Sequence, residues 1–347
     1  VASTEAQAAE APAPGLDPLT VPGFESRPAI AVLPFDNLSG DPDQEYFADG
    51  IAEDLITRLS AWRDFPVIAR NSSFTYKGRA VDVKQVGREL GARYVLEGSV
   101  RKGEDRVRIS AQLIDATTGA HVWAETYDRE LEDIFRLLDE ITEAISGSSY
   151  PEVVRSEEHR TVRKEPQSLD AWDWFIQGRW HFEKVTKEDH QKALLFFKKA
   201  TELEPTFGLA FGFIALVHVA AAGLGWSDSR EESIQEAIRL ARKTLELDRR
   251  ESLGHVALAH TLAFTGQQQQ AIAAFERAVE ADPTQPYPYG HLGFFLSHTG
   301  RPDEAIAHLK RAMSLSPKDV AMFLWLTGMG LAHFAKGEYE EAASWLE

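Results

Sequence analysis

The amino-acid sequence predicts an α/β (α+β) domain over residues 28–146, followed by an all-α solenoid of helical repeats over residues 168–347. In residues 107–115, apolar side chains alternate with polar ones, which is the period of a strand that is buried on one face. In residues 271–317, one pattern of small, large apolar and proline residues occurs twice with a shift of 34 residues. A fixed period of this size indicates stacked helical units, so we expect the two halves to fold differently.

The composition limits the classes of function. The 347 residues contain no cysteine, which excludes disulfides, zinc–thiolate sites and cysteine nucleophiles. The net charge of −17 is spread over both halves and argues against nucleic acid or an anionic membrane as the main partner. Residues 1–27 are rich in alanine and proline and lack apolar periodicity, so we expect a disordered linker. Because the chain does not begin with methionine, we expect an upstream portion to precede it.

The first half opens with strand and helix signals in alternation. Residues 30–35 form a short apolar run typical of a buried strand, and residues 36–43 are rich in turn-forming side chains. A helix is predicted over residues 44–61, because large apolar residues recur there at four-residue spacing. Residues 65–70 predict a second strand.

Another helix and three more strands complete the predicted domain. Asp82 is suited to cap the start of a helix, and Gly91 is suited to end it. The three strands are predicted over residues 94–102, 107–115 and 121–127. A last helix over residues 131–145, apolar on one side, is expected to close the unit.

Four segments of this half carry a family resemblance. They are IAVLPFDNLSGDPDQEYFADGIAEDLITRLS, VIARNSSFTYKG, VGRELGARYVLEGSVRK and VRISAQLIDATTGAHVWAETYDRELEDIF, and together they cover essentially all of residues 29–135. This half resembles the TolB amino-terminal-like domain. Residues 147–167, which follow, are polar and charged and fit either an extension of the closing helix or a hinge.

The second half is organised by the repeated pattern. The repeated positions are Ala271, Phe275, Ala278 and Pro283, and then Ala305, Leu309, Ala312 and Pro317. Small residues let two helices approach, the large residue fills the gap between them, and proline ends the second helix. Gly266 and Gly300 stand five residues ahead of each copy, where a turn between helices needs a positive φ. The pattern resembles the tetratricopeptide repeat, with about five repeats and the last one incomplete.

The first two repeats depart from the regular period. The first is expected to have a turn about three residues longer, and the second about ten extra residues near positions 223–232. Residues 207–226 are apolar and long enough to resemble a membrane span. Equivalent repeat ends flank this segment at residues 202–205 and 246–249, so we predict a buried repeat helix instead.

No motif predicts catalysis. The sequence lacks the common glycine-rich phosphate loops and the GxSxG elbow. Asp36, Asp41 and Asp43 could bind a cation, but bonds to local backbone amides and helix capping are the favoured roles. His255 and His260 are five residues apart and would lie on different helix faces, which disfavours a metal site. We therefore predict no catalytic residue, no metal and no cofactor in this chain.

The repeat resemblance implies a concave surface lined by the first helix of each pair. The 34-residue shift then gives the candidate partner-binding residues His260, Phe264, Tyr287, Phe294 and His298. Aromatic and amphipathic side chains in a groove are suited to gripping an extended peptide or a helix. Phe264 and Phe294 could equally pack between repeats. At the other end, Trp345 and Leu346 predict an exposed apolar surface and hence a candidate homodimer contact.

A TolB-like domain followed directly by tetratricopeptide repeats resembles the C-terminal half of a bacterial signalling family. The resemblance implies an upstream class III nucleotide cyclase or winged-helix DNA-binding domain, often with a membrane helix before the TolB-like part. Residues 1–27 would then be the juxtamembrane linker. The expected role is a non-catalytic sensory and protein-interaction region, on the periplasmic side of a membrane-anchored cyclase. The alternatives are the same region of a winged-helix regulator, a cytoplasmic location, and an enzyme with a site in the α/β domain. We expect a protein or peptide partner.

Overall fold

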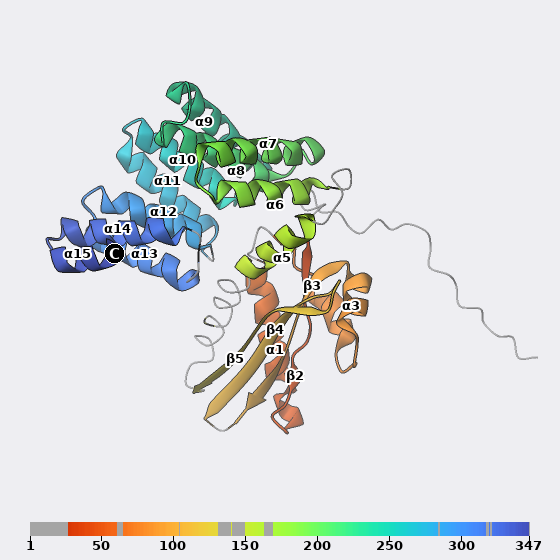
Figure 1. Ribbon diagram of the computed structural model, residues 1–347. Coiled ribbons are helices and arrows are strands. Elements are labelled where there is room, and N and C mark those ends of the chain that lie inside the picture. Colours follow the sequence, from red (N-terminus) through yellow and green to blue (C-terminus); the bar gives the residue numbers. More distant parts are fainter. Residues whose placement is uncertain are drawn as a thin grey trace, which may run out of the picture.

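The computed structural model describes residues 27–60, 65–103, 105–130, 140, 150–162, 169–283, 285–316, 319 and 321–346. Figure 1 shows a part built around a sheet and a helical solenoid, with helix α5 lying between them. The predicted order of an α/β domain followed by an all-α solenoid is confirmed. Among the described residues beyond 168, every regular element is a helix.

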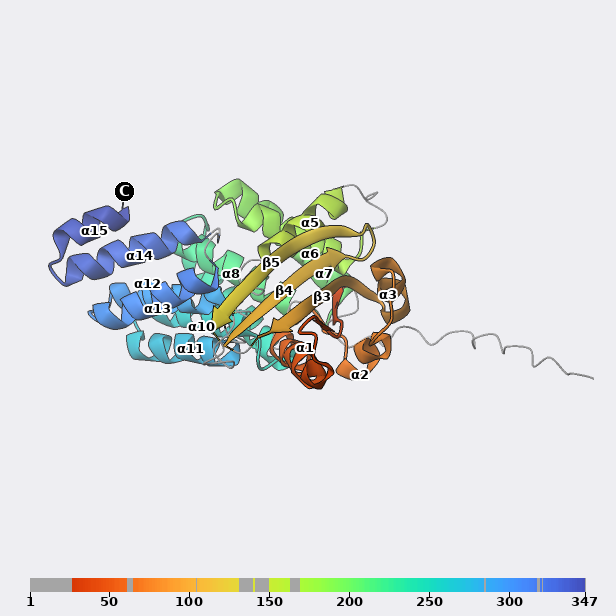
Figure 2. The ribbon, with the colours of Figure 1, turned by 90° about the horizontal axis from the view of Figure 1, so that it is seen from below.

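The first part contains a five-stranded mixed sheet. Its strands are β1 (Ala29–Val32), β2 (Asp36–Asn37), β3 (Ala92–Lys102), β4 (Arg106–Asp115) and β5 (Ala120–Glu130). β1 and β2 both pair with β3 in parallel. β3, β4 and β5, which correspond to the three strands predicted last, form an antiparallel meander and lie side by side in Figure 2.

Helices cover both faces of the β1 end of the sheet. α1 (Glu45–Leu59) packs on one face together with Ile30 and Val32, and α3 (Val83–Leu90) packs on the other near Ala31 and Leu33. Successive strand residues point to opposite faces, so β1 is buried on both sides. This explains why its sequence is an unbroken apolar run rather than an alternating one.

The ends of α3 follow the predicted capping. The Asp82 carboxylate accepts a hydrogen bond from the backbone N–H of Lys84 at 3.0 Å. Gly91 ends the helix with a φ of 65°, in the left-handed region that favours glycine.

Two predictions for the first part were wrong in detail. The strand expected at residues 65–70 is a single parallel bridge between Ile30 and Val67, because Pro66 has no N–H to donate and helix α2 (Arg70–Ser73) begins three residues later. The turn expected at residues 36–43 contains the short strand β2 and a 3₁₀ turn at Pro42–Gln44. The closing helix predicted over residues 131–145 lies, except for residue 140, outside the described residues.

The connector is helical where it is described. Helix α5 (Tyr150–Val162) occupies most of the segment 147–167, for which the sequence left open a helix extension or a hinge. Val153 and Val154 are buried and belong to the same apolar core as the sheet and the first helix pair. The connector therefore packs against both parts instead of spanning a gap between them.

The solenoid contains five helix pairs. They are α6 (Ala171–Phe182) and α7 (Lys187–Leu203), α8 (Gly208–Gly223) and α9 (Arg230–Leu247), α10 (Ser252–Phe264) and α11 (Gln268–Ala281), α12 (Pro286–Ser297) and α13 (Pro302–Leu315), and α14 (Met322–Ala335) and α15 (Tyr339–Leu346). The repeated residues Phe275 and Leu309 are fully buried, as are the alanines of both copies. Gly266 and Gly300 both adopt a φ of 76°, as the turn between helices requires.

The irregular repeats lengthen their helices more than their turns. In the first pair, the turn of residues 183–186 has four residues, and most of the extra length is in α7, which has 17 residues against 14 in α11. In the second pair, α8 and α9 have 16 and 18 residues, and six residues join them. No helix of the described residues is long and apolar enough to cross a membrane, and the apolar segment 207–226 contains the repeat helix α8.

Candidate functional site: the inner face of the repeats

The third and fourth repeats bring two of the predicted groove residues together. His260 lies on α10, and Tyr287 lies on α12, one helix pair further along. Between them stands His291, whose Nδ1 is 2.8 Å from Nε2 of His260 and whose ring centroid is 4.0 Å from that of Tyr287. The ring of Phe275, from the second helix of the third repeat, meets His260 edge-on at 5.0 Å.

Burial determines the ionisation of this cluster. His291 is buried, whereas His260 and Tyr287 keep partial contact with solvent. Burial lowers the pKa of His260 to about 4 and also holds the pKa of His291 well below its usual range, with the neighbouring His260 adding to the effect. Burial likewise raises the pKa of the Tyr287 hydroxyl. At neutral pH the cluster is therefore uncharged, with imidazole nitrogens and a phenol as its polar groups.

Phe264 borders this cluster, with its ring centroid 6.3 Å from that of His260. Phe264 packs on its own repeat and the preceding one, with the guanidinium of Arg230 5.3 Å from its ring centre. Phe294 and His298 form a second pair, with ring centroids 4.7 Å apart. His298 is exposed, and its Nδ1 lies 2.8 Å from the backbone oxygen of Phe294. As a partner surface, the five residues remain a prediction.

Arg179, on α6 of the first repeat, is not among the predicted residues. Its guanidinium carbon lies 5.5 Å above the ring of Phe213, and its Nη2 lies 3.3 Å from the carboxylate of Glu183. The charge of Asp319 further raises the pKa of the Tyr287 hydroxyl, and the charge of Arg179 opposes this effect. The sequence does contain a signal for this position. Arg179 directly follows a small residue, Gly178. In the same way, the predicted residues His260 and Phe294 directly follow Ala259 and Gly293.

Carboxylates surround Arg179 on this inner face. Burial raises the pKa of Glu158 on α5, and the negative charge of Glu183 raises it further. Burial also raises the pKa of Asp319, between α13 and α14. Charged groups from α5, from the first repeat and from the segment between α13 and α14 therefore influence one another.

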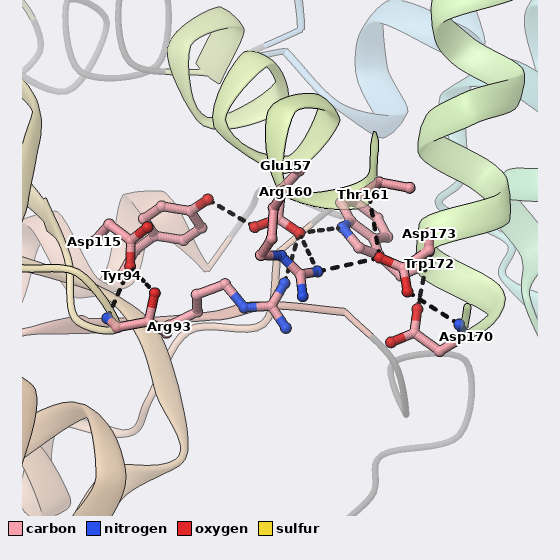
Figure 3. Close-up of polar contacts among 10 residues, drawn as sticks. Arg93, Tyr94, Asp115, Glu157, Arg160, Thr161, Asp170, Trp172 and Asp173 are labelled. Atoms are coloured by element: carbon pink, nitrogen blue, oxygen red, sulfur yellow. Dashed lines mark hydrogen bonds and ion pairs between the residues drawn. The ribbon is translucent and has the colours of Figure 1, made fainter. Parts of the chain in front are cut away.

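A buried polar network joins α5 to both parts of the chain (Figure 3). The side chain of Glu157 on α5 is only 1% exposed, and its carboxylate accepts hydrogen bonds from four donors. The donors are Arg93 Nη1 at 2.5 Å, the Tyr94 hydroxyl at 2.8 Å, Arg160 Nη2 at 2.9 Å and Trp172 Nε1 at 2.9 Å. Arg93 and Tyr94 belong to β3, and Trp172 belongs to the first repeat helix, so one carboxylate ties the sheet to the solenoid.

A second buried carboxylate continues the network into the first repeat. Asp173 forms a capping box with Asp170 at the start of α6, with backbone-to-side-chain distances of 2.8 and 3.0 Å. The other contacts of Asp173 reach back to α5, to Arg160 at 3.3 Å and to the Thr161 hydroxyl at 3.1 Å. Because Glu157 and Glu158 are adjacent on α5, this helix bonds to the sheet with one side chain and borders the inner face with the next.

The other candidate residues have local roles. In the turn at residues 36–43, Asn37 Oδ1 accepts from the Ser39 N–H at 3.0 Å and Asn37 Nδ2 donates to the Asp41 backbone oxygen at 2.8 Å, as expected for a turn after a strand. The predicted capping of the next helix is not formed, because the N-cap residue of α1 is Gln44 and makes no side-chain cap hydrogen bond. Within the described ranges, no group of three or more acidic, histidine or cysteine side chains is placed to hold a metal ion. Trp345 is half-buried on the last repeat, and Leu346 is 57% exposed. Their role in dimerisation stays a prediction.

Comparison with known proteins identifies the helical part. Residues 254–285 and 287–347 match two tetratricopeptide-repeat family models. The solenoid is a tetratricopeptide-repeat array. Residues 26–144 match the model described as the second domain of HilA/YgeH-like transcriptional regulators.

One relative spans both parts of the chain. A curated protein of Rhizobium meliloti (strain 1021), named "Putative adenylate cyclase 3", is 40% identical over 250 residues. The matched region covers 72% of this chain and 43% of that protein, so the chain spans less than half the length of this relative.

Solved structures similar to the chain are more distant. The tetratricopeptide-repeat protein TTC0263 of Thermus thermophilus is 18% identical with a TM-score of 0.40, covering 59% of this chain and 99% of that one. TolB from Acinetobacter baumannii is 18% identical with a TM-score of 0.27, covering 37% of this chain and 28% of that one. Because both TM-scores are low, the repeat assignment rests on the family models and on the five helix pairs.

Proposed function

We infer that this chain is a non-catalytic sensory and protein-interaction region of a bacterial signalling protein of the adenylate cyclase type. The observation that carries the inference is the alignment with the Rhizobium meliloti protein, which at 250 residues is longer than the repeat array of residues 168–347. The similarity therefore includes part of the repeats and part of the chain that precedes them. More than half of that protein lies outside the matched region, which leaves room for a separate catalytic domain.

The inner face of the repeats is the proposed binding surface. Tyr287 and His260 offer an aromatic ring and an imidazole that keep contact with solvent, and Arg179 supplies a cation to the same space. Such side chains suit the grip of an extended protein segment, in which a few aromatic anchors supply much of the affinity. Phe294 and His298 extend the surface on the fourth repeat.

The proposed location is the periplasmic side of a membrane anchor placed upstream of this chain. This follows from the domain order described above, in which a TolB-like domain and repeats follow a cyclase and a membrane helix. The alternative is the same region of a transcription regulator in the cytoplasm. The match of residues 26–144 to the second domain of HilA/YgeH-like regulators favours this alternative. The sequence of the full-length protein separates the two, because it contains either a cyclase or a DNA-binding domain.

A site-specific cross-linking experiment tests the binding surface. A photoreactive benzoylphenylalanine is placed at Tyr287 in the full-length protein, and in a matched control at Leu195, which is 62% exposed on α7. We expect a discrete adduct with another protein from position 287 and none from position 195. Adducts from the control alone would move the binding surface to the outer face.

The double variant Tyr287→Ala/Phe294→Ala provides the quantitative test with the partner so identified. Truncation of aromatic anchors should weaken binding by about 2 kcal/mol or more for each anchor. The circular dichroism spectrum should stay helical, since neither side chain is fully buried. Unchanged affinity in a folded double variant would contradict the proposed groove.

A further inference from the structure

A second concave site lies in the α/β domain, away from the repeats. A cavity of about 880 Å³ opens on the sheet between the loop that follows β1 and the loop of residues 77–81. This volume is within the range of about 300–1,000 Å³ that is typical of small-molecule sites. The site belongs to neither the groove nor the polar network at Glu157.

The floor of the cavity consists of two neighbouring rows of side chains across three strands, and five of these six side chains are polar. Glu97, Gln112 and Ala124 are paired across β3, β4 and β5 in one row. Ser99, Ser110 and Thr126 are paired in the next row. Further along this face, towards the N-terminal end of β3, Val95 packs in the core that includes Val86 of α3. The polar rows lack such apolar groups, which explains why a helix does not cover this end of the face.

The floor offers hydrogen-bonding groups that the fold leaves available. Gln112 Nε2 donates to Glu97 Oε1 at 2.6 Å, and the hydroxyls of Ser110 and Thr126 lie 3.1 Å apart. Each hydroxyl has one proton, so one proton of the Ser110–Thr126 pair remains to be donated. Across the described part of the chain, no protein group bonds the Ser99 hydroxyl, Oε2 of Glu97 or Oε1 of Gln112. Donors and acceptors thus converge within two adjacent rows.

The walls determine which ligands fit. Leu33 and Val81 provide apolar sides to the cavity. The ionisable lining comprises the carboxylates Asp36, Glu45 and Glu97 against the two cations Lys77 and Arg79, while the carboxylate of Glu125 already accepts a hydrogen bond from the Tyr127 hydroxyl at 2.6 Å. Lys77 is already paired, with Glu45 at 3.2 Å and with Asp49. An anion would therefore meet net negative charge, whereas a neutral ligand rich in hydroxyl groups could use both the donors and the acceptors.

We propose that this cavity binds a neutral, polyhydroxylated small molecule of sugar or polyol type, contacted by Ser99, Ser110, Thr126, Gln112 and Glu97. The ligand would lie on the polar rows, with its carbon skeleton against Leu33 and Val81. Binding at this site would give the chain a small-molecule input separate from its protein-binding groove.

The test is an NMR titration of the whole chain with D-glucose, D-ribose, myo-inositol and, as the anionic comparison, inorganic phosphate. At least one neutral probe should shift the amide signals of Ser99, Ser110 and Thr126 in a saturable manner, and phosphate should not. In Ser99→Ala and Gln112→Leu, the same probe should bind at least ten-fold more weakly. Arg101→Gln is the matched control, because Arg101 lies on β3 two residues beyond Ser99, is exposed and does not line the cavity.

Three outcomes would overturn the proposal. They are no saturable shift with any of the three neutral probes, preferential binding of phosphate, and equal binding by the wild type and the two cavity variants. If Gln112→Leu loses its folded spectrum, Thr126→Val replaces it, since valine has the shape of threonine without its hydroxyl. The groove plays no part in this titration, so its result does not depend on the proposed protein partner.

Discussion

The Nε2 atom of His260 lies 2.8 Å from the Nδ1 atom of His291, and this contact joins α10 to α12 across the boundary between the third and fourth repeats. A hydrogen bond between two neutral imidazoles needs one ring nitrogen as donor and the other as acceptor. Two protonated rings would have two donors facing each other, and both charges would lie in a poorly solvated site. The boundary between these repeats is therefore sensitive to acid.

Acid should weaken the repeats through this pair. The pKa of His260 is lowered to about 4 in the folded protein, so between pH 6.5 and 4 the unfolded chain binds more protons. Stability is complete above the unfolded pKa and falls as the pH drops, at most by about 1.4 kcal/mol per pH unit for this group. Urea unfolding at pH 7, 6 and 5 should show a shallower loss in His260→Gln than in the wild type. The exposed His298→Gln variant is the control, and its free energy of unfolding should fall with pH as steeply as that of the wild type. Burial also lowers the pKa values of four other histidines, whose contribution is the same in every variant: His190, His218, His255 and His308.

Removal of Glu157 should destabilise the junction between the two parts strongly. In Glu157→Ala, the Trp172 indole N–H and the Tyr94 hydroxyl lose a buried acceptor, and Arg93 and Arg160 lose their shared carboxylate. Breaking a buried ion pair from one side costs about 3–5 kcal/mol. Urea unfolding followed by tryptophan fluorescence measures the loss. Glu152→Ala is the control on the same helix, because its 41% exposed side chain pairs only with Arg155 and should cost less than about 1 kcal/mol. Equal losses of stability in the two variants would show that the buried network stabilises the junction no more than an exposed ion pair does.

Two glycine-to-alanine changes should act in opposite directions. At Gly178, the added methyl would lie 2.5 Å from two ring carbons of Phe197, so α6 and α7 would be forced apart. The expected cost is about 1–3 kcal/mol, as for other overpacked cores. At Gly50, inside α1, the methyl would meet nothing within 4 Å, and the better helix propensity of alanine should stabilise by about 0.5–1 kcal/mol. Thermal unfolding distinguishes the two, and a stabilised Gly178→Ala would disprove the close helix contact.

We expect the last repeat to mediate self-association through its exposed apolar side chains. Leu346 is 57% exposed, and Phe334 on the preceding helix is 61% exposed. Leu346→Glu should lower the apparent mass in light scattering at high protein concentration, because a charge would be buried in the contact. The exposed Leu203→Glu variant on α7 is the control and should have no effect. A monomeric wild type under the same conditions would exclude this surface as a dimer contact.

Local patterns predicted most of the fold. The 34-residue shift between Phe275 and Leu309 predicted stacked helix pairs, because each pair needs the same small-large-small contact to pack. Asp82 and Gly91 fixed the ends of α3, since capping depends on a few adjacent backbone groups. The strand expected at residues 65–70 failed because an apolar run alone cannot show that Pro66 and the helix starting at Arg70 leave only one bridge to β1.

The sequence by itself thus determined the order of domains, the repeat period and most helix ends, because these depend on residues that are close along the chain. Only the tertiary structure decided the sites. Glu157 meets Arg93 from 64 residues away, and His260 meets His291 from 31 residues away. The polar rows at Glu97 and Ser99 become a cavity floor only when three strands align and two loops border them. Such contacts depend on how whole elements pack, and side-chain periodicity within one element carries no information about that packing.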